Sequence, residues 1–446
     1  MKINIYEWEN INSELRSRLL KRSELNIDSI SASVSEILKN VRQNGDNALI
    51  EYAKKFDGVE LSGVPLAVSA DEFKDAKESL SRKVRQAIEH AIRNVEKFHR
   101  EQLPDNLPGA SYADVLKNLK EVEPGVFAGE RHTPIQSAGL YVPRGRGSFP
   151  SMMIMEAVPA SVAGVKRIAV ATPPDKKGAV DPATLYAASQ CGVTEVYRIG
   201  GAQAIAALAY GTESVGRTAK ILGPGSMYIA AAKRLLYGTV DVGLPAGPSE
   251  SIIIADGTAD PEKAAMDLII EAEHGSDSSA ILVTHSRELA ESAQGYIEKF
   301  VKRLKEPRAG FVKDVLSGYG GIVLTQNIET SIEFVNEFAP EHLQIAMKDP
   351  FKTLKYIENA GEILLGQNTP FSLANYAAGA NAILPTGGNA GTYSPLSVHD
   401  FMKFSSVVYI TKEGLEGLSP DVITLADYEG FEAHALALRE RMKNRK

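Results

Sequence analysis

The chain has 446 residues, of which 44% are hydrophobic, so it can bury a sizeable core and is long enough for about three structural units. Its formal net charge of −7 and its pI near 5.8 provide no basic surface for nucleic acid. The single cysteine, Cys191, excludes an internal disulfide and every multi-cysteine metal site, so any metal must be held by histidine, carboxylate or amide groups.

The N-terminal residues do not resemble a signal peptide or a membrane anchor. They read MKINIYEWENINSELRSRLL, with charges spread throughout, and no apolar run in the chain approaches the roughly 20 residues that span a bilayer. We therefore expect a cytoplasmic protein with neither a membrane nor a nucleic acid as its partner.

Residues 1–100 are predicted to be mostly helical, because apolar residues recur at helical spacing and the stretch DEFKDAKESLSRKVRQAIEHAIRNVEKFHREQ is long and highly charged. From about residue 138, short apolar runs such as AGLYV, RIAVAT, SIIIAD and AILVTH alternate with helical segments. This alternation predicts parallel sheets with crossover helices, hence an α/β fold of Rossmann-like type. After about residue 396, SVHDFMKFSSVVYI and FEAHALALRERMKNRK indicate a separate, mostly helical tail.

Glycine spacing does not establish a nucleotide site. GRGSFP has Pro150 where a dinucleotide fingerprint requires its third glycine, and no phosphate-loop lysine motif is present. Two stretches remain candidates, RIGGAQAIAALAYG and LGPGSMYIAAAKR, because each leads into a helix N-terminus whose free N–H groups suit phosphate. Ordinary turn chemistry explains both stretches equally well.

The segment EAEHG places Glu271 three residues before His274, so both side chains lie on one helix face and can reach the same point. That point could hold a metal ion. It could equally be water, because His274 immediately precedes Gly275, where a helix C-terminus favours a protonated imidazole. Taken alone, the segment favours the solvated pair.

The segment FAPEHLQIAM joins a helical pattern to a strand-like one, with Glu341 and His342 at the junction. A carboxylate and an imidazole on a connection between regular elements are placed as acid–base residues often are. A polar strand start explains the same pattern.

Several longer stretches together resemble the histidinol dehydrogenase family. They are GLYVP, GGAQAIAALAYGTE, ILGPG, YIAAAKR, AGPSE, AEHG, APEHL, LPTGG and EGFEAH, in family order over roughly residues 30–440. The resemblance implies a zinc-containing, NAD-dependent enzyme that oxidises a primary alcohol through an aldehyde to a carboxylate, using two NAD per turnover. It also implies a homodimer in which each active site borrows residues from the partner's C-terminal tail.

We therefore predict an α/β fold with two Rossmann-like three-layer domains and helical N- and C-terminal extensions. The expected divisions are a helical arm (1–35), a first Rossmann-like domain with the metal and catalytic site (36–139 and 250–396), a second with the NAD contacts (140–249), and a tail that contributes to the partner's active site (397–446).

The resemblance also implies residue roles. His342 resembles the general base that accepts the alcohol proton, which suits an imidazole because its usual pKa lies near neutrality, and Glu341 resembles the residue that activates water for the second oxidation. The remaining positions are Ser249, His342, Glu429 and His434 for substrate, and Tyr141, Gln203 and Ser226 for NAD. Ser226 stands where the family usually has Asn, which shortens one polar side chain.

The family's zinc ligands are Gln, His, Asp and His, and the matching positions here are Glu271, His274, Asn375 and His434. The two exchanges are isosteric, and the set still contains one carboxylate, one amide and two imidazoles. We therefore predict that a divalent ion is retained, with Glu271 as the anionic ligand.

The substrate pocket departs further from the family. Phe371 and Ala382 stand where the family has a Glu and a His that hold the substrate's imidazole, and a pocket without those groups loses that discrimination. This favours a small polar alcohol, such as an amino alcohol, as substrate. Two alternatives remain, namely L-histidinol itself and a non-catalytic paralogue that binds a ligand. Arg144, at a position usually glycine, could meet an anionic group or be a solvated loop residue.

Overall fold

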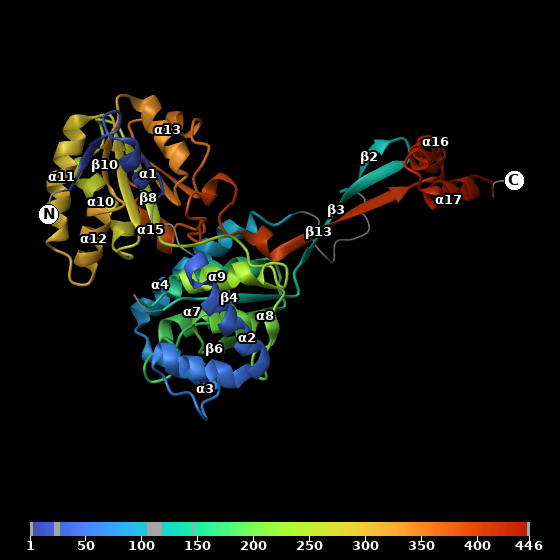
Figure 1. Ribbon diagram of the computed structural model, residues 1–446, viewed down its shortest axis with the longest axis horizontal. Coiled ribbons are helices and arrows are strands. Elements are labelled where there is room, and N and C mark those ends of the chain that lie inside the picture. The colour runs from blue at the N-terminus through green and yellow to red at the C-terminus, as the bar shows by residue number, and fades with distance from the viewer. Residues whose placement is uncertain (1–2, 22–26, 105–117, 145–146, 444–446) are drawn as a thin grey trace. The chain divides into compact units, whose positions relative to one another are not determined.

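The computed structural model describes residues 3–21, 27–104, 118–144 and 147–443, which form two compact units. The first unit comprises residues 1–102 and 135–401 and contains two parallel sheets, each covered by helices (Figure 1). The second unit comprises residues 103–134 and 402–446. Among the described residues, no helix is both long enough and apolar enough to cross a membrane.

The larger sheet has six parallel strands in the order β1-β10-β9-β8-β11-β12. The strands are β1 (Ile5–Glu7), β8 (Glu250–Ala255), β9 (Ser279–Thr284), β10 (Gly321–Leu324), β11 (His342–Ala346) and β12 (Glu362–Leu365). Every residue of β8 to β11 is buried, as expected for a parallel sheet covered on both faces.

Helices pack on both faces of this sheet and make it the middle of three layers. One face carries α10 (Pro261–Ala272), α11 (Arg287–Val301), α12 (Arg308–Ser317) and α15 (Phe371–Tyr376). The other face carries α1 (Ser13–Lys21), α13 (Ile328–Phe338) and α14 (Pro350–Leu354).

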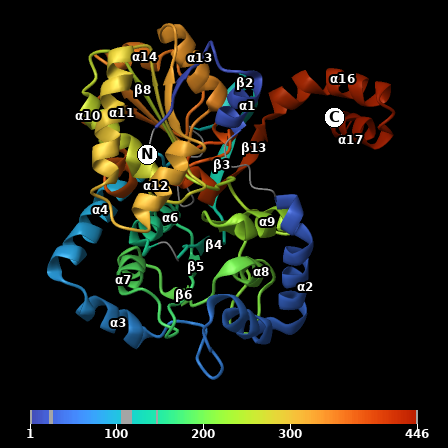
Figure 2. The same ribbon diagram turned by 60° about the vertical axis from the view of Figure 1, so that its left-hand side comes forward.

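The smaller sheet has four parallel strands in the order β6-β5-β4-β7. They are β4 (Ser137–Tyr141), β5 (Arg167–Ala171), β6 (Glu195–Tyr197) and β7 (Lys220–Leu222). One group of helices comprises α3 (Ala70–Ser79), α4 (Arg82–Arg100), α6 (Pro150–Val162) and α7 (Pro182–Gln190). The other comprises α2 (Ile27–Tyr52), α8 (Gly201–Tyr210) and α9 (Met227–Leu236), on the opposite face of the sheet (Figure 2). Because β4 lies between β5 and β7, the strand order reverses there, which is where doubly wound sheets bind ligands.

The helices of residues 27–100 pack against the helices that cover the smaller sheet, whereas residues 36–139 were predicted to belong to the domain of the larger sheet. In addition, β1 from the expected helical arm is an edge strand that pairs in parallel with β10. An amphipathic pattern predicts that a helix has an apolar face, but it does not say which sheet covers that face. The assignment of these segments to one sheet or the other therefore depends on tertiary contacts.

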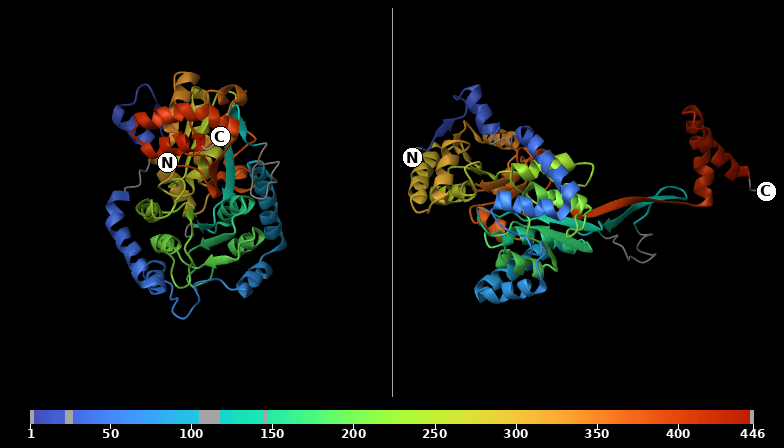
Figure 3. Two further views of the ribbon diagram at one scale, coloured as in Figure 1. Left: turned by 90° about the vertical axis from the view of Figure 1, so that its right-hand side faces the viewer. Right: turned by 60° about the horizontal axis from the view of Figure 1, so that its bottom comes forward.

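The second unit contains the antiparallel sheet β13-β3-β2 and two helices. Its elements are β2 (Lys120–Glu123), β3 (Val126–Pro134), β13 (Met402–Ile410), α16 (Lys412–Tyr428) and α17 (Glu432–Lys443). The nine-residue strand β13 leads into the two C-terminal helices (Figure 3, orange to red). The prediction of a mostly helical tail was therefore wrong for FMKFSSVVYI, where β-branched and aromatic residues favour a strand.

Candidate active site

Six predicted site residues lie together at the amino-terminal edge of the larger sheet. Strands β8 and β11 begin there, and α10 runs back toward that edge after β8, so its last turn ends beside the two strand starts. The six residues are Ser249, Glu271, His274, Glu341, His342 and Asn375.

Glu271 is the centre of this group, and its side chain is fully buried on α10. Its Oε1 accepts a hydrogen bond of 2.7 Å from Nδ2 of Asn375, and its Oε2 lies 3.2 Å from Nδ1 of His274. That nitrogen also lies 3.0 Å from Oγ of Ser249. Burial raises the pKa of the Glu271 carboxyl, but His274, His342 and the Asn375 hydrogen bond outweigh it and hold the pKa below its usual value. The interior therefore holds an ionised carboxylate.

Two oxygen atoms of this group, Oε2 of Glu271 and Oδ1 of Asn375, are buried without a hydrogen-bond partner among the described residues. Buried polar atoms are normally satisfied, so two orphaned oxygens beside an imidazole suggest a ligand that completes them. The described residues contain no cluster of three His, Cys, Asp or Glu side chains suited to a metal. This donor set instead combines one carboxylate, one imidazole and one amide oxygen, and these groups fit a divalent ion such as zinc.

Glu341 and His342 lie side by side at the start of β11, and both are buried. Oε2 of Glu341 accepts a hydrogen bond of 2.8 Å from the Glu250 backbone N–H, and its Oε1 lies 3.9 Å from Nε2 of His342. Burial raises the pKa of Glu341 to about 8, although His342 opposes this shift. A carboxyl group with such a pKa can both hold and release a proton near neutral pH.

The His342 ring has two further neighbours, Glu362 and Phe371. Nδ1 of His342 lies 2.9 Å from Oε2 of the buried Glu362, and the ring of the fully buried Phe371 packs edge-on, with ring centroids 5.7 Å apart. Burial lowers the pKa of His342, but the carboxylates of Glu271, Glu341 and Glu362 together raise it to about 10. Glu362 could not be predicted from the sequence, because a charged residue that opens the run EILLG indicates only a strand start. Its partner strand is set by the tertiary fold.

The three predicted NAD contacts lie at the carboxyl edge of the smaller sheet. Tyr141 ends β4, Gln203 lies in the first turn of α8, and Ser226 is the residue before α9. Oη of Tyr141 accepts a hydrogen bond of 3.2 Å from the Gly201 backbone N–H, and burial raises the pKa of Tyr141 to about 12. Gln203 is 2% exposed, and its Oε1 has no hydrogen-bond partner among the described residues. This edge therefore offers a neutral phenol and an unsatisfied amide oxygen.

The other two predicted site residues, Glu429 and His434, belong to the second unit. Glu429 follows α16 and His434 lies on α17, where its ring is 5.3 Å from that of Phe431. The first unit thus supplies three of the four predicted metal donors. Arg144 donates a hydrogen bond of 3.2 Å from Nη1 to the Ala179 carbonyl, so its guanidinium is anchored to a neighbouring turn.

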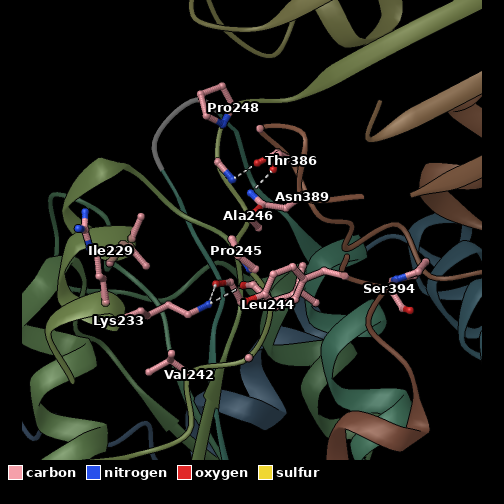
Figure 4. Close-up of a pocket in the computed structure, with 18 of the residues that line it drawn as sticks. Ile229, Lys233, Val242, Leu244, Pro245, Ala246, Pro248, Thr386, Asn389 and Ser394 are labelled. Carbon is pink, nitrogen blue, oxygen red and sulfur yellow. Dashed lines mark hydrogen bonds between the residues drawn. The ribbon is translucent and has the colours of Figure 1, made fainter. Parts of the chain in front are cut away.

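A cavity of about 1080 Å³ lies along the segment that leads to Ser249, and Glu250 forms part of its lining. Nζ of Lys233 donates hydrogen bonds of 3.2 Å and 3.4 Å to the carbonyls of Gly223 and Leu244 (Figure 4). On the other side, the Gly247 N–H donates to Oγ1 of Thr386 at 2.7 Å. The segment is therefore held both by α9 and by the loop around residue 386.

Comparison with known proteins gives one consistent result. The family model described as histidinol dehydrogenase matches residues 20–442. A histidinol dehydrogenase of Synechocystis sp. is 52% identical over 98% of both chains, and a histidinol dehydrogenase homolog of Colwellia psychrerythraea is 48% identical over 98% of this chain and 96% of its own. The crystal structure of histidinol dehydrogenase from Elizabethkingia anophelis has a TM-score of 0.91 at 34% identity and covers 99% of this chain and 98% of its own.

Proposed function

Because this chain belongs to the histidinol dehydrogenase family, whose members are oxidoreductases, we propose that it oxidises L-histidinol through the aldehyde to the carboxylate, with NAD and zinc. Phe371 and Ala382 in the predicted substrate pocket favour a different polar alcohol, but relatives named histidinol dehydrogenase at up to 52% identity favour L-histidinol. The observation that carries the proposal is the buried pair Glu341 and His342 beside the donor group of Glu271, His274 and Asn375.

In the first oxidation, His342 accepts the hydroxyl proton of the substrate while the carbon-bound hydrogen leaves as hydride to NAD and the carbon–oxygen bond becomes a carbonyl. A zinc ion held by Glu271, His274 and Asn375 would polarise the hydroxyl oxygen, and its charge would offset that of Glu271. The Glu271 carboxylate is one of the charges that raise the pKa of His342. Offsetting that charge would lower the pKa of His342 and favour the neutral, basic form of its ring.

In the second oxidation, Glu341 accepts a proton from water as the water oxygen adds to the aldehyde carbon. The hydrate anion formed in this way then loses its carbon-bound hydrogen as a second hydride to a second NAD and becomes the carboxylic acid. The raised pKa of Glu341, about 8, suits a group that must take up a proton near neutral pH and release it again. Its buried position also limits competition from bulk water.

The carboxyl edge of the smaller sheet is the proposed NAD site. Tyr141, Gln203 and Ser226 lie where the strand order reverses, and α8 and α9 begin there without a side-chain hydrogen bond from their N-cap residues, Gly200 and Ser226. The unsatisfied Oε1 of Gln203 supports this assignment, because an amide or hydroxyl donor of the cofactor could satisfy it.

The second unit is proposed to complete the active site of a partner subunit in a homodimer. Apolar side chains on its helices are exposed, including Leu425 at 61%, Tyr428 at 91%, Phe431 at 54% and Leu436 at 54%. Such a concentration of exposed apolar groups on a small unit favours an interface. Glu429 caps the end of α16 and His434 lies in the first turn of α17, so a partner surface that covers this junction would receive both residues.

A second candidate substrate is a small polar alcohol without an imidazole. The observation that favours it is Phe371, which presents a ring edge to His342 where the family has a glutamate for the substrate's imidazole. An apolar wall discriminates weakly between polar groups of similar size.

The test is NADH formation by the zinc-loaded enzyme with L-histidinol, with L-histidinal and with a panel of amino and hydroxyl-bearing alcohols. We expect two NADH per L-histidinol. His342→Gln should lower kcat by about 100- to 10,000-fold and leave a measurable residual rate, and Glu341→Gln should release the aldehyde. His285→Gln should behave as wild type, because His285 follows β9 at the opposite edge of the sheet. Turnover of a different alcohol alone would overturn L-histidinol as substrate. No NADH with any alcohol would favour a non-catalytic, ligand-binding protein.

A further inference from the structure

The pairing of β11 with β12 places a second carboxylate against the proposed base. His342 and Glu362 are the first residues of their strands and are direct partners in the parallel register. Side chains of partnered residues in a parallel sheet point to the same face, and here that face is the one covered by α10. Strand pairing alone therefore places the imidazole beside the carboxylate, and both side chains are carried by regular strands.

The contact is close and buried. Oε2 of Glu362 lies 2.9 Å from Nδ1 of His342, and the two side chains are 7% and 4% exposed. Because both side chains are buried, neither can rotate toward solvent, and the two groups are held in one geometry. The remaining ring nitrogen, Nε2, lies toward Glu341, with Oε1 of that residue 3.9 Å away.

We propose that Glu362 is a positioning residue that holds His342 with its proton on Nδ1 and thereby presents Nε2 as the base. This inference rests on the proposed function, in which His342 accepts the substrate's hydroxyl proton. A neutral imidazole carries one proton on two nitrogens, and a carboxylate at one of them fixes which nitrogen keeps it. Without that carboxylate the ring can carry its proton on Nε2, and the nitrogen facing the substrate is then no longer basic.

Glu362 also stabilises the imidazolium that forms when the substrate proton arrives. The charged groups that face His342 come from three elements: Glu271 on α10, Glu341 before β11, and Glu362 on β12. Of these, Glu362 makes the shortest contact with the ring and is aligned with Nδ1. Its second oxygen, Oε1, has no hydrogen-bond partner among the described residues, so no other side chain of the described chain competes for its charge.

The experiment compares Glu362→Gln with a matched control, Asp267→Asn. Asp267 is a buried carboxylate on the same sheet face that accepts a hydrogen bond of 2.8 Å from Nε2 of Gln344, the residue two positions after His342. We expect Glu362→Gln to lower kcat for L-histidinol by about 10- to 100-fold with little change in KM. Asp267→Asn should leave kcat within about twofold of wild type.

Two further measurements separate positioning from mere stability. In the His342→Gln background, Glu362→Gln should have no additional effect on kcat, because Glu362 acts through that ring. Nitrogen-15 NMR of the eight histidines, with His342 assigned by its loss in His342→Gln, should report an Nδ1-protonated neutral ring or an imidazolium in the wild type and an altered tautomer in Glu362→Gln.

The NMR readout needs no substrate, so a wrong substrate assignment would leave it intact. A Glu362→Gln protein with wild-type kcat and an unchanged His342 tautomer overturns the proposal. An equal loss of kcat from Glu362→Gln in the wild-type and His342→Gln backgrounds overturns it as well. If Glu362→Gln does not fold, Glu362→Asp serves the same measurements and should show a smaller loss of kcat.

Discussion

The contact between Glu271 and Asn375 allows a quantitative test of the metal site. Glu271→Gln removes the one carboxylate from a donor group otherwise made of an amide and an imidazole. A unit charge about 4 Å from another is worth about 4 kcal/mol at an effective dielectric constant near 20. We therefore expect Glu271→Gln to weaken zinc binding by about a thousandfold, since each 1.4 kcal/mol is about tenfold.

Asn375→Asp should act in the opposite direction. It places a second carboxylate at hydrogen-bond distance, where the amide now donates at 2.7 Å, so the metal-free protein should lose about 4 kcal/mol of stability and the zinc-loaded protein should regain it. The double exchange Glu271→Gln with Asn375→Asp keeps one carboxylate and reverses the hydrogen bond. Its zinc affinity should lie within about tenfold of wild type.

The assay is a zinc titration in competition with a chromophoric chelator, together with melting temperatures of metal-free and zinc-loaded proteins. Glu273→Gln is the charge-matched control, because it removes one carboxylate from the same segment, two residues from Glu271. Equal zinc affinities for Glu271→Gln and Glu273→Gln would refute the site. So would a metal-free Asn375→Asp protein as stable as wild type.

Three other predictions follow from the described geometry. Gly223→Ala should lower the melting temperature more than Gly238→Ala: both have positive φ (+113° and +87°), but only at Gly223 would the new Cβ lie 2.2 Å from the carbonyl oxygen of Tyr141. Cys191 should be inert to a thiol reagent in the native protein and react fully in denaturant, because burial raises its pKa to about 12. Folding raises the pKa of His342 from 6.5 to about 10, so protonated His342 stabilises the metal-free protein fully below about pH 6.5, and this stabilisation is lost as the pH rises through about 10. The difference in melting temperature between wild type and His342→Gln should therefore shrink over that range.

The sequence predicted the parts of the site that depend on local spacing. An i, i+3 pair on a helix shares one face whatever the tertiary fold, and His274 does lie 3.2 Å from Glu271. The junction of helix and strand likewise placed Glu341 and His342 correctly at a strand start. The solvated alternative does not hold for Glu271, which is fully buried, whereas the His274 side chain is 43% exposed.

The parts that depend on strand pairing could not be predicted from one sequence. Glu362 is twenty residues from His342, and only the parallel register of β11 and β12 makes them neighbours. The same limit explains the misplaced helices of residues 27–100, because an apolar helix face does not specify which domain it packs against. It also explains β1, three residues whose pairing with β10 crosses more than 300 positions, since a strand so short carries almost no periodicity.

The two sheets present opposite edges to the two proposed ligands, and the helix dipoles agree with that arrangement. At the carboxyl edge of the smaller sheet, α8 and α9 begin at Gly201 and Met227, and their positive ends suit the phosphates of a dinucleotide. At the amino edge of the larger sheet, α10 ends beside Glu271, and its negative end favours a metal ion and a protonated imidazole. An open parallel sheet usually binds ligands at its carboxyl edge, so the larger sheet departs from that rule. This departure has a physical basis. The partial negative charge of a helix C-terminus stabilises a bound cation, whereas the helix N-termini at the carboxyl edge of the sheet would repel it.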